Sequence, residues 1–354
     1  TDIIDTTITV KNMEGEDTQL QILNPHEAKR MLGVYLSIDG SNDVQIKEMK
    51  KIANIWFEQV RAGHITRYDA WYALQSTVMK KLEYPLTALT LKNEECKSIM
   101  SPILQGGLPR IGICRTMARD LVYTPLKYQG LGVNDLYVSQ GLAHIKALMN
   151  HMWQRTTTGK LLISTMEYLK IEVGIRGSIF TQEFEVYGHL AEDSWIKHLW
   201  QFVSDTGITI HDDLKDFELI REYDSTLTDN FARAYIGKKI TKAEWRKANK
   251  CRIFLQIFTV GDIATADGMT IEENILKGIY QGSRARNIEW PYQQRPKPSD
   301  WTCFRRVLRK SIINNTGNLR TSLGRWIQNT ERTYKDKWEW WLNHENDLLY
   351  RQKD

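Results

Sequence analysis

The sequence has few cysteines, and none of them stands in a pattern that binds metal. Its four cysteines are Cys96, Cys114, Cys251 and Cys303; no two form a C-x-x-C pair, and none has a histidine at metal-ligand spacing. Scattered cysteines of this kind are typical of buried thiols in a reducing compartment. We therefore expect an intracellular protein, cytoplasmic or nuclear, without a structural metal.

Long apolar runs and a secretory leader are also missing. No apolar stretch approaches the roughly 18 residues of a membrane span, and the N-terminus has no basic segment followed by an apolar one. Only 8 of 354 residues are proline, and 42% are hydrophobic, which favours regular elements around a core. These features predict a soluble protein of two or three domains with no membrane partner.

The sequence offers no recognisable catalytic set. It has no Gly-rich phosphate loop, and no histidine is paired with Ser or Cys in the manner of an activated nucleophile. Two adjacent carboxylates, Asp212 and Asp213, could in principle hold Mg²⁺. Gly207 before them and Leu214 after them favour a helix start with Asp at its cap instead. We predict no catalytic residue and no metal ligand.

Positive charge is concentrated toward the C-terminus. From Lys277 to the end there are 16 Lys or Arg against 8 Asp or Glu, an excess of +8, and the rest of the chain carries −3. Such an excess is an electrostatic footprint for phosphate, or an ordinary solvated surface. Composition alone leaves both interpretations open.

Hydrophobic periodicity predicts a mostly α-helical α+β fold with a short N-terminal β-hairpin. The hairpin strands are expected at residues 3–10 and 19–23, and a third strand at 29–36. A further strand is expected at 253–260, breaks at 105–109 and 174–178, and a linker at 295–298. Helices are expected at about 42–62, 66–81, 93–104, 136–154, 158–173, 193–205 and 304–313.

Three groups of basic residues are candidates for contact with nucleic acid. On the first long helix they lie opposite an apolar face formed by Met49, Ile52, Ala53, Trp56 and Val60. A second group is spaced through a loop and a short helical turn, where cations can follow a sugar-phosphate backbone. The third lies on the basic helix near the C-terminus. In chain order the three groups are Lys47, Lys51 and Arg61; Arg110, Arg115, Arg119 and Lys127; and Arg305, Arg306, Arg309 and Lys310.

The third group is followed by tryptophans. Trp326, Trp338 and Trp340 could stack on the bases of a single strand next to these cations. Alternatively they fill a small core against the same helix. The sequence does not decide between the two.

Several segments together resemble the region downstream of the catalytic palm in reverse transcriptases of non-LTR retrotransposons, closest to retroelement-like reading frames of diatoms. The resemblance covers most of the chain. Its segments are Glu27–Val34, Lys80–Leu86, Ile103–Arg110, Pro125–Val133, Asp262–Gly268, Leu323–Trp326 and Trp338–Trp340.

This resemblance implies an organisation and a ligand. Residues 1–42 would be the end of a palm, with Leu32 and Gly33 as a primer-grip-like turn. Residues 43–175 would be a helical thumb and connector, and residues 176–354 a mixed C-terminal region. The partners would be an RNA template with a DNA primer and an upstream palm, which would hold the catalytic aspartates and Mg²⁺. The alternatives are a free-standing RNA- or DNA-binding protein and a Trp-rich scaffold that binds proteins.

Overall fold

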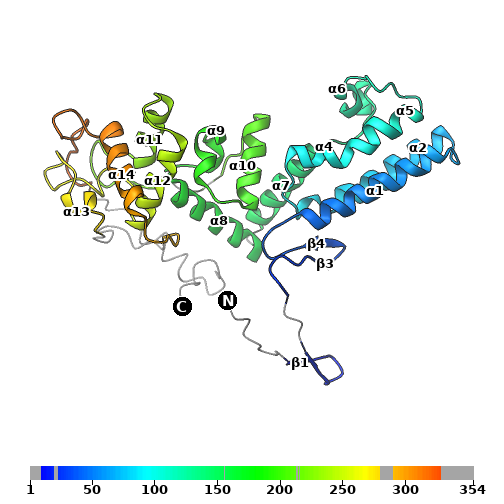
Figure 1. Ribbon diagram of the computed structural model, residues 1–354, viewed down its shortest axis with the longest axis horizontal. Coiled ribbons are helices and arrows are strands. Elements are labelled where there is room, and N and C mark those ends of the chain that lie inside the picture. Colours follow the sequence, from blue (N-terminus) through cyan, green and yellow to red (C-terminus); the bar gives the residue numbers. More distant parts are fainter. Residues whose placement is uncertain are drawn as a thin grey trace. The chain divides into compact units, whose positions relative to one another are not determined.

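The computed structural model describes residues 9–19, 23–154, 156–212, 214, 216–279 and 290–327. These residues are mostly helical, with two small antiparallel hairpins near the N-terminus (Figure 1), so the predicted α+β class is confirmed. The chain divides into two compact units, residues 1–143 and 144–354. The sequence placed domain boundaries after residues 42 and 175, and each of these positions lies inside one unit.

The first hairpin joins β1 (Thr9–Lys11) to β2 (Asp17–Gln19). Its turn is closed by Asn12, whose Oδ1 accepts hydrogen bonds from the backbone N–H groups of Glu14 and Glu16, both at 2.9 Å. The reversal of the chain expected between the two predicted hairpin strands is therefore found. The rest of the predicted strand segments, residues 3–8 and 20–22, lies outside the described residues.

The second hairpin replaces the single strand predicted for residues 29–36, and that prediction was wrong. β3 (Lys29–Met31) pairs with β4 (Val34–Leu36), with Met31 opposite Val34. Leu32 and Gly33 form the two-residue turn between them, with φ angles of 47° and 89°. Two successive positive φ values give the turn a twist that matches paired strands, so the chain reverses where its β-branched and apolar pattern favoured continuation.

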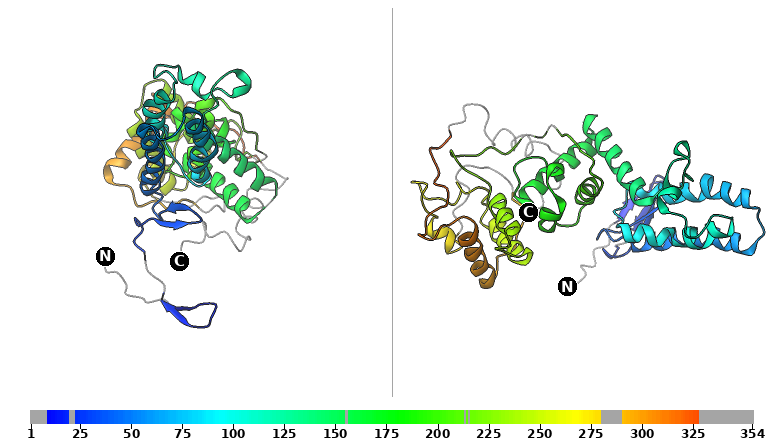
Figure 2. Two further views of the ribbon diagram at one scale, coloured as in Figure 1. Left: turned by 90° about the vertical axis from the view of Figure 1, so that its right-hand side faces the viewer. Right: turned by 90° about the horizontal axis from the view of Figure 1, so that it is seen from above.

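Helices make up the remainder of unit 1, and α1 and α4 run side by side in it (Figure 2). Two segments of π-helix interrupt the α-helical ones. The elements are α1 (Asp43–Ala62), α2 (Arg67–Ala73), η1 (Leu74–Val78), α3 (Met79–Glu83), η2 (Tyr84–Thr87), α4 (Asn93–Ser101), η3 (Pro102–Gly107), α5 (Leu108–Arg110), α6 (Arg119–Tyr123) and η4 (Leu126–Tyr128).

The apolar face of α1 is the centre of this unit, as its periodicity predicts. Met49, Ala53, Trp56 and Val60 are buried, and Ile52 packs against the same core. The indole Nε1 of Trp56 donates a hydrogen bond to the carbonyl of Ala70 at 3.1 Å, so its polar atom is satisfied inside the core.

Residues 105–109 do not break the helix after α4, contrary to expectation. The chain continues through η3 into α5. A Cβ at Gly106 would lie 2.6 Å from Phe57, and one at Gly107 only 2.1 Å from Trp56. The two glycines are therefore present so that this helix can approach α1 closely, and not to end it.

The boundary between the units lies within α7 (Leu136–Trp153), and unit 2 is built from further helices and irregular segments. The predicted helices at 158–173 and 193–205 are found, shifted by one or two residues. The elements are α8 (Thr157–Val173), η5 (Ile179–Thr181), α9 (Phe184–Tyr187), η6 (Gly188–Leu190), α10 (Trp195–Thr206), α11 (Leu227–Ile236), α12 (Lys242–Phe254), α13 (Glu273–Leu276) and α14 (Pro298–Ser311).

A buried guanidinium holds α8 to α12. Arg252 is fully buried, and its Nη2 donates to the carbonyls of Ile171 at 2.6 Å and Glu172 at 2.7 Å. Asn249 donates to the same Glu172 carbonyl at 2.9 Å, and Thr228 donates to that of Val173 at 2.8 Å. Three polar side chains thus satisfy the last carbonyls of α8, which a helix end leaves without partners.

Two other predictions for unit 2 were wrong, and the linker predicted at 295–298 ends one residue earlier than expected because Pro298 already belongs to α14. Residues 253–260 form no strand: α12 extends to Phe254, and the chain then turns through Gln256, which has a φ of 54°. The apolar run reflects burial on all sides, which periodicity alone cannot assign. Residues 295–298 lead directly into α14, since Pro298 is its first residue and Asp300 accepts a hydrogen bond from Lys297 N–H at 3.1 Å. No helix starts at Asp212 in the described residues.

The close approach of Gly107 to the Trp56 ring can be tested by measuring the stability of a Gly107 variant. We expect Gly107→Ala to lower the free energy of unfolding by about 1–3 kcal/mol, because the added methyl group overlaps the Trp56 ring. The measurement is urea denaturation of the full chain. Trp56→Leu removes the overlapping atoms, so in that background the same substitution should cost clearly less. Equal costs in both backgrounds would contradict the packing described.

Glu172 makes the stability of unit 2 depend on pH. Burial raises the pKa of its carboxyl group from 4.5 to about 7, although its Oε1 accepts a hydrogen bond from Glu192 N–H at 2.9 Å. The folded state therefore holds a proton that the unfolded state has lost between pH 4.5 and 7, and stability falls as pH rises through that window. Glu172→Gln should remove this loss of stability. The free energy of unfolding of the variant, relative to that of the wild type, should therefore be higher at pH 8 than at pH 4.5 by up to about 3 kcal/mol. A difference that stays constant with pH would contradict it.

Candidate nucleic-acid interface

The segment from Gly106 to Asn134 forms a fixed platform on unit 1, although its sequence suggests a loose loop. Backbone hydrogen bonds close its second half: Leu131 N–H donates to Leu121 at 2.9 Å, and Val133 N–H donates to Val122 at 3.1 Å. Val122 and Val133 are both fully buried in the core that α1 organises. These two buried valines therefore anchor the exposed residues of the segment to the core.

Gly130 allows this closure. A Cβ at that position would lie 2.0 Å from the carbonyl oxygen of Thr124, so no other residue fits the observed backbone. Gly132 follows with a φ of 67°, and its N–H donates to Thr124 O at 2.9 Å. The conformation between Tyr123 and Val133 is therefore dictated by two glycines and their hydrogen bonds.

This platform displays the four cations that the sequence singled out. Arg110, Arg115 and Lys127 are exposed, and Arg119 is half-buried. None of them makes an ion pair within the part of the chain that the structure describes. Lys127 instead lies 4.6 Å from the ring centroid of Tyr128. Between Gly106 and Asn134 the only acidic residue is Asp120, so this segment carries a net charge of +3.

The predicted basic face of α1 carries less unpaired positive charge than the platform. Lys47, Lys51 and Arg61 are all exposed. Arg61 Nε donates to Glu58 at 2.6 Å, however, and Lys51 lies 4.0 Å from Glu48. Only Lys47 has no ion pair among the described residues, so neighbouring carboxylates offset most of the charge on this face.

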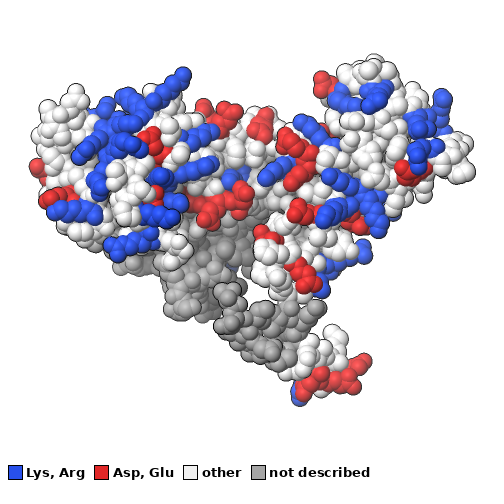
Figure 3. All heavy atoms as spheres, viewed as in Figure 1, with Lys and Arg blue, Asp and Glu red and all other residues white. Residues whose placement is uncertain are grey.

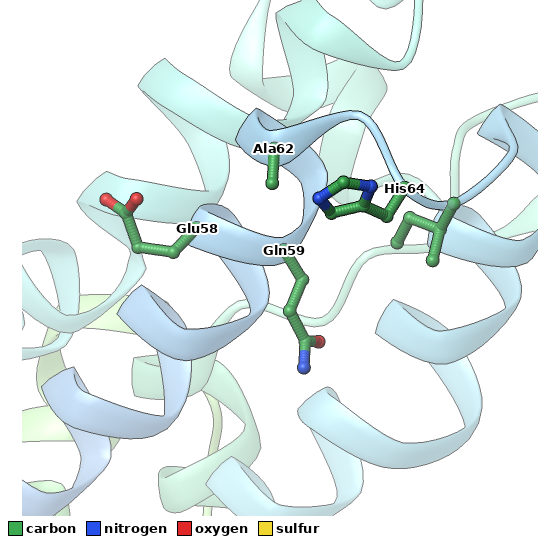
Figure 4. A pocket seen from close by; sticks show the side chains of 5 residues that line it. Glu58, Gln59, Ala62 and His64 are labelled. Carbon is green, nitrogen blue, oxygen red and sulfur yellow. The ribbon is translucent and has the colours of Figure 1, made fainter.

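An open depression of about 480 Å³ adjoins the C-terminal end of α1 (Figure 4). Glu58, Gln59 and Ala62 line it from the helix, and His64 and Ile65 line it from the following turn. Because Glu58 is bound to Arg61, the depression offers no free charge for a ligand. Nothing in its chemistry indicates a catalytic or metal site.

The turn at Leu32 and Gly33 combines an exposed apolar tip with a rigid base. Leu32 is 92% exposed, and its positive φ is unfavourable for a residue with a branched side chain. The hydroxyl of Tyr84 donates to the Leu32 carbonyl at 2.7 Å, and Gln45 accepts from Tyr35 N–H at 2.8 Å. An exposed, strained residue on a fixed support is a candidate contact point.

The four basic residues of α14 are mostly engaged within unit 2. Arg306 forms an ion pair with Glu244 at 2.9 Å, and Lys310 lies 3.7 Å from the same carboxylate. Arg305 donates to the carbonyl of Leu276 at 3.1 Å. Of the four, only Arg309 is exposed and makes no hydrogen bond or ion pair among the described residues. A contact with nucleic acid through this group stays a prediction.

Trp326 is held against a buried arginine. The Trp326 ring centroid is 5.1 Å from Cζ of Arg221, whose Nη2 donates to Gly324 at 2.9 Å and whose Nη1 donates to Thr265 at 3.0 Å. The segments 262–268 and 323–326, quoted above for their resemblance, thus meet around one guanidinium. Trp326 is still 54% exposed. Trp338 and Trp340 lie outside the described residues.

Asp212 has a structural role in place of the metal-binding one considered above. Its Oδ2 accepts from the Ser178 hydroxyl at 2.5 Å, and its Oδ1 accepts from Leu214 N–H at 3.2 Å. In the described part of the chain, no group of three His, Cys, Asp or Glu side chains is arranged to hold a metal ion. Asp213 lies outside it.

Sequence reasoning missed the basic exposed face of α12, which carries Lys242, Arg246, Lys247 and Lys250. The signal was present in the printed sequence as cations four residues apart.

Comparison of the chain with protein families, with curated proteins and with solved structures finds no match. Among the described helices, none combines the length and apolar character needed to cross a bilayer.

The strain at Leu32 gives a test of the turn. We expect Leu32→Asn to raise the free energy of unfolding by about 0.5–1 kcal/mol, because Asn tolerates a positive φ better than Leu. Ile38→Asn is the control, since Ile38 is 78% exposed but is not in the left-handed region. If both variants change stability equally in urea denaturation, the turn is not strained.

Proposed function

We propose that this chain holds nucleic acid, as the C-terminal portion of a retroelement RNA-directed DNA polymerase whose ligand is an RNA template paired with a DNA primer. The observation that carries the proposal is the platform from Gly106 to Asn134. It presents Arg110, Arg115, Arg119 and Lys127 without ion-pair partners among the described residues.

Uncompensated cations on a fixed backbone suit phosphate binding. Surface cations that already form ion pairs must break them before they bind phosphate, whereas these cations are available. Each phosphate neutralised releases counterions from the nucleic acid, and that release favours binding without regard to sequence. Because buried residues and two glycines hold the platform, little ordering of the backbone is needed when the ligand binds.

The hairpin turn supports the same proposal. The family resemblance assigns Leu32 and Gly33 to a turn that positions a primer, and the structure has a fixed, exposed turn at these residues. We infer that the Leu32 side chain contacts the primer strand. The Lys47, Lys51 and Arg61 face of α1 would add contacts only where the ligand displaces Glu58 and Glu48.

Of the alternatives, the free-standing nucleic-acid-binding protein would use the same surfaces. The Trp-rich scaffold is disfavoured by burial. Trp56, Trp200, Trp245 and Trp290 are at most 4% exposed. Of the tryptophans whose side chains the structure describes, only Trp326 is exposed. Tryptophans that fill cores are not available to bind a protein partner.

The platform can be tested by the salt dependence of binding. For the triple variant Arg110→Gln, Arg115→Gln and Lys127→Gln, we expect the slope of log K against log salt for an RNA–DNA hybrid to flatten by up to about three. A control with the same loss of charge replaces the half-buried Lys29 and the exposed Lys80 and Lys277, which are already bound to Glu27, Glu83 and Glu273. If the control flattens the slope equally, the effect is net charge alone and the platform is not the interface.

The chain alone should not extend primers. Transfer of a phosphoryl group to a primer requires metal ions held in line with the 3′ hydroxyl, and we assign those ligands to an upstream palm. We therefore expect no extension above background with Mg²⁺ or Mn²⁺. Extension by the pure chain that is lost on Asp212→Ala would overturn this assignment.

A further inference from the structure

The segment from Lys238 to Arg252 is the second concentration of positive charge in the described chain. It contains seven Lys or Arg and one acidic residue, Glu244. The last of the seven, Arg252, is buried, and the other six are exposed. Figure 3 shows Lys and Arg gathered over the part of unit 2 that holds α11, α12 and α14.

The two faces of α12 differ completely. Its buried residues are Trp245, Ala248, Asn249, Cys251, Arg252 and Ile253. Its exposed residues are Lys242, Ala243, Arg246, Lys247 and Lys250, and at 100° per residue they span an arc of about 140°. Four of these five residues are cationic, and none is acidic.

The only carboxylate of the helix faces another way. Glu244 accepts from Thr241 N–H at 2.8 Å, which caps the helix, and it forms ion pairs with Arg306 at 2.9 Å and Lys310 at 3.7 Å on α14. It is therefore occupied at the contact with α14 and cannot offset the charges on the exposed face.

This arrangement opposes the stability of the helix. Lys242, Arg246 and Lys250 repeat at a spacing of four residues, and like charges at that spacing destabilise a helix. Arg246 uses its Nε to hold the carbonyl of His189 at 3.1 Å, but the exposed lysines make no ion pair within the described residues. Lys242 Nζ lies 5.9 Å from the centroid of the Tyr235 ring. Packing therefore accounts in part for Lys242 and Arg246, but not for Lys247 and Lys250.

We propose that the exposed face of α12 is a second nucleic-acid contact, which binds the phosphate backbone independently of the platform on unit 1. Lys242 to Lys250 spans about 12 Å of helix axis. Along that length a duplex carries about seven phosphate charges, since one occurs per roughly 1.7 Å. The cations recur once per turn and can therefore follow a regular series of phosphates.

A membrane surface fits this face less well. A helix that lies on a bilayer exposes an apolar side to insert beneath its charged side. Here the apolar side of α12 is buried in unit 2, where Trp245 and Ala248 are both 0% exposed. The exposed face offers no apolar residue larger than Ala243.

The test uses the full chain with Lys242→Gln, Arg246→Gln and Lys250→Gln together. Gln retains helix propensity, and circular dichroism and a melting curve check that the fold is kept. We expect at least about tenfold weaker binding of an RNA–DNA hybrid, or of single-stranded RNA, at about 0.1 M salt, and a slope flatter by up to about three. The control is again the exchange of Lys29, Lys80 and Lys277, which removes the same charge from ion-paired positions.

Two outcomes of this experiment would overturn the proposal. Binding equal to that of the control variant would overturn the proposal, and so would loss of binding to phosphatidylserine vesicles with no change toward oligonucleotides. Because the platform variant changes unit 1 and this one changes unit 2, the two surfaces can fail separately. If both contribute, combining the two triple variants should lower affinity by roughly the product of their separate effects.

Discussion

The guanidinium of Arg252 is the interaction on which unit 2 depends. It is buried without an ion pair to a carboxylate in the described chain, and it lies at the C-terminal end of α8, where the helix dipole favours a positive charge. Burial lowers its pKa, and the nearby Glu172 and Asp262 counteract that shift. Since Asn249 and Arg252 both hold the Glu172 carbonyl, the rotation of α12 about its axis is set by these contacts. The face of α12 that points away from these contacts, with Lys247 and Lys250, is exposed as a consequence.

Unit 1 presents its cations by a comparable arrangement of a buried support below an exposed charge. There the support is the contact of Trp56 with Gly107 and the burial of Val122 and Val133. In both units, few carboxylates are placed to neutralise the cationic surface. Glu244 is bound to Arg306, and Asp120 is the only acid in the platform segment. Rigid positive surfaces of this kind favour a ligand with a repeating negative charge.

Much of the fold could be predicted where periodicity is strong, as in α1, where Met49, Ala53, Trp56 and Val60 are buried as the sequence pattern predicts. The failures have physical causes. Gly106 and Gly107 resemble a break, but they serve close packing against a helix more than forty residues earlier. Leu32 is an unusual residue for a turn with positive φ. For the candidate site, the sequence gives the cations but not their counterions. Whether Arg306 is free depends on Glu244, which is distant in sequence and adjacent in the fold.

The central claim is that each of two cationic surfaces, one on each unit, binds nucleic acid, and lysine footprinting tests it most directly. The rate of acetylation of Lys127, Lys242, Lys250 and Lys277 would be measured by mass spectrometry, with and without a saturating RNA–DNA hybrid. We predict slower modification of Lys127, Lys242 and Lys250 in the presence of the hybrid, and an unchanged rate at Lys277, which is bound to Glu273 at 2.8 Å. Unchanged rates at all four lysines, or equal slowing at Lys277, would contradict the account.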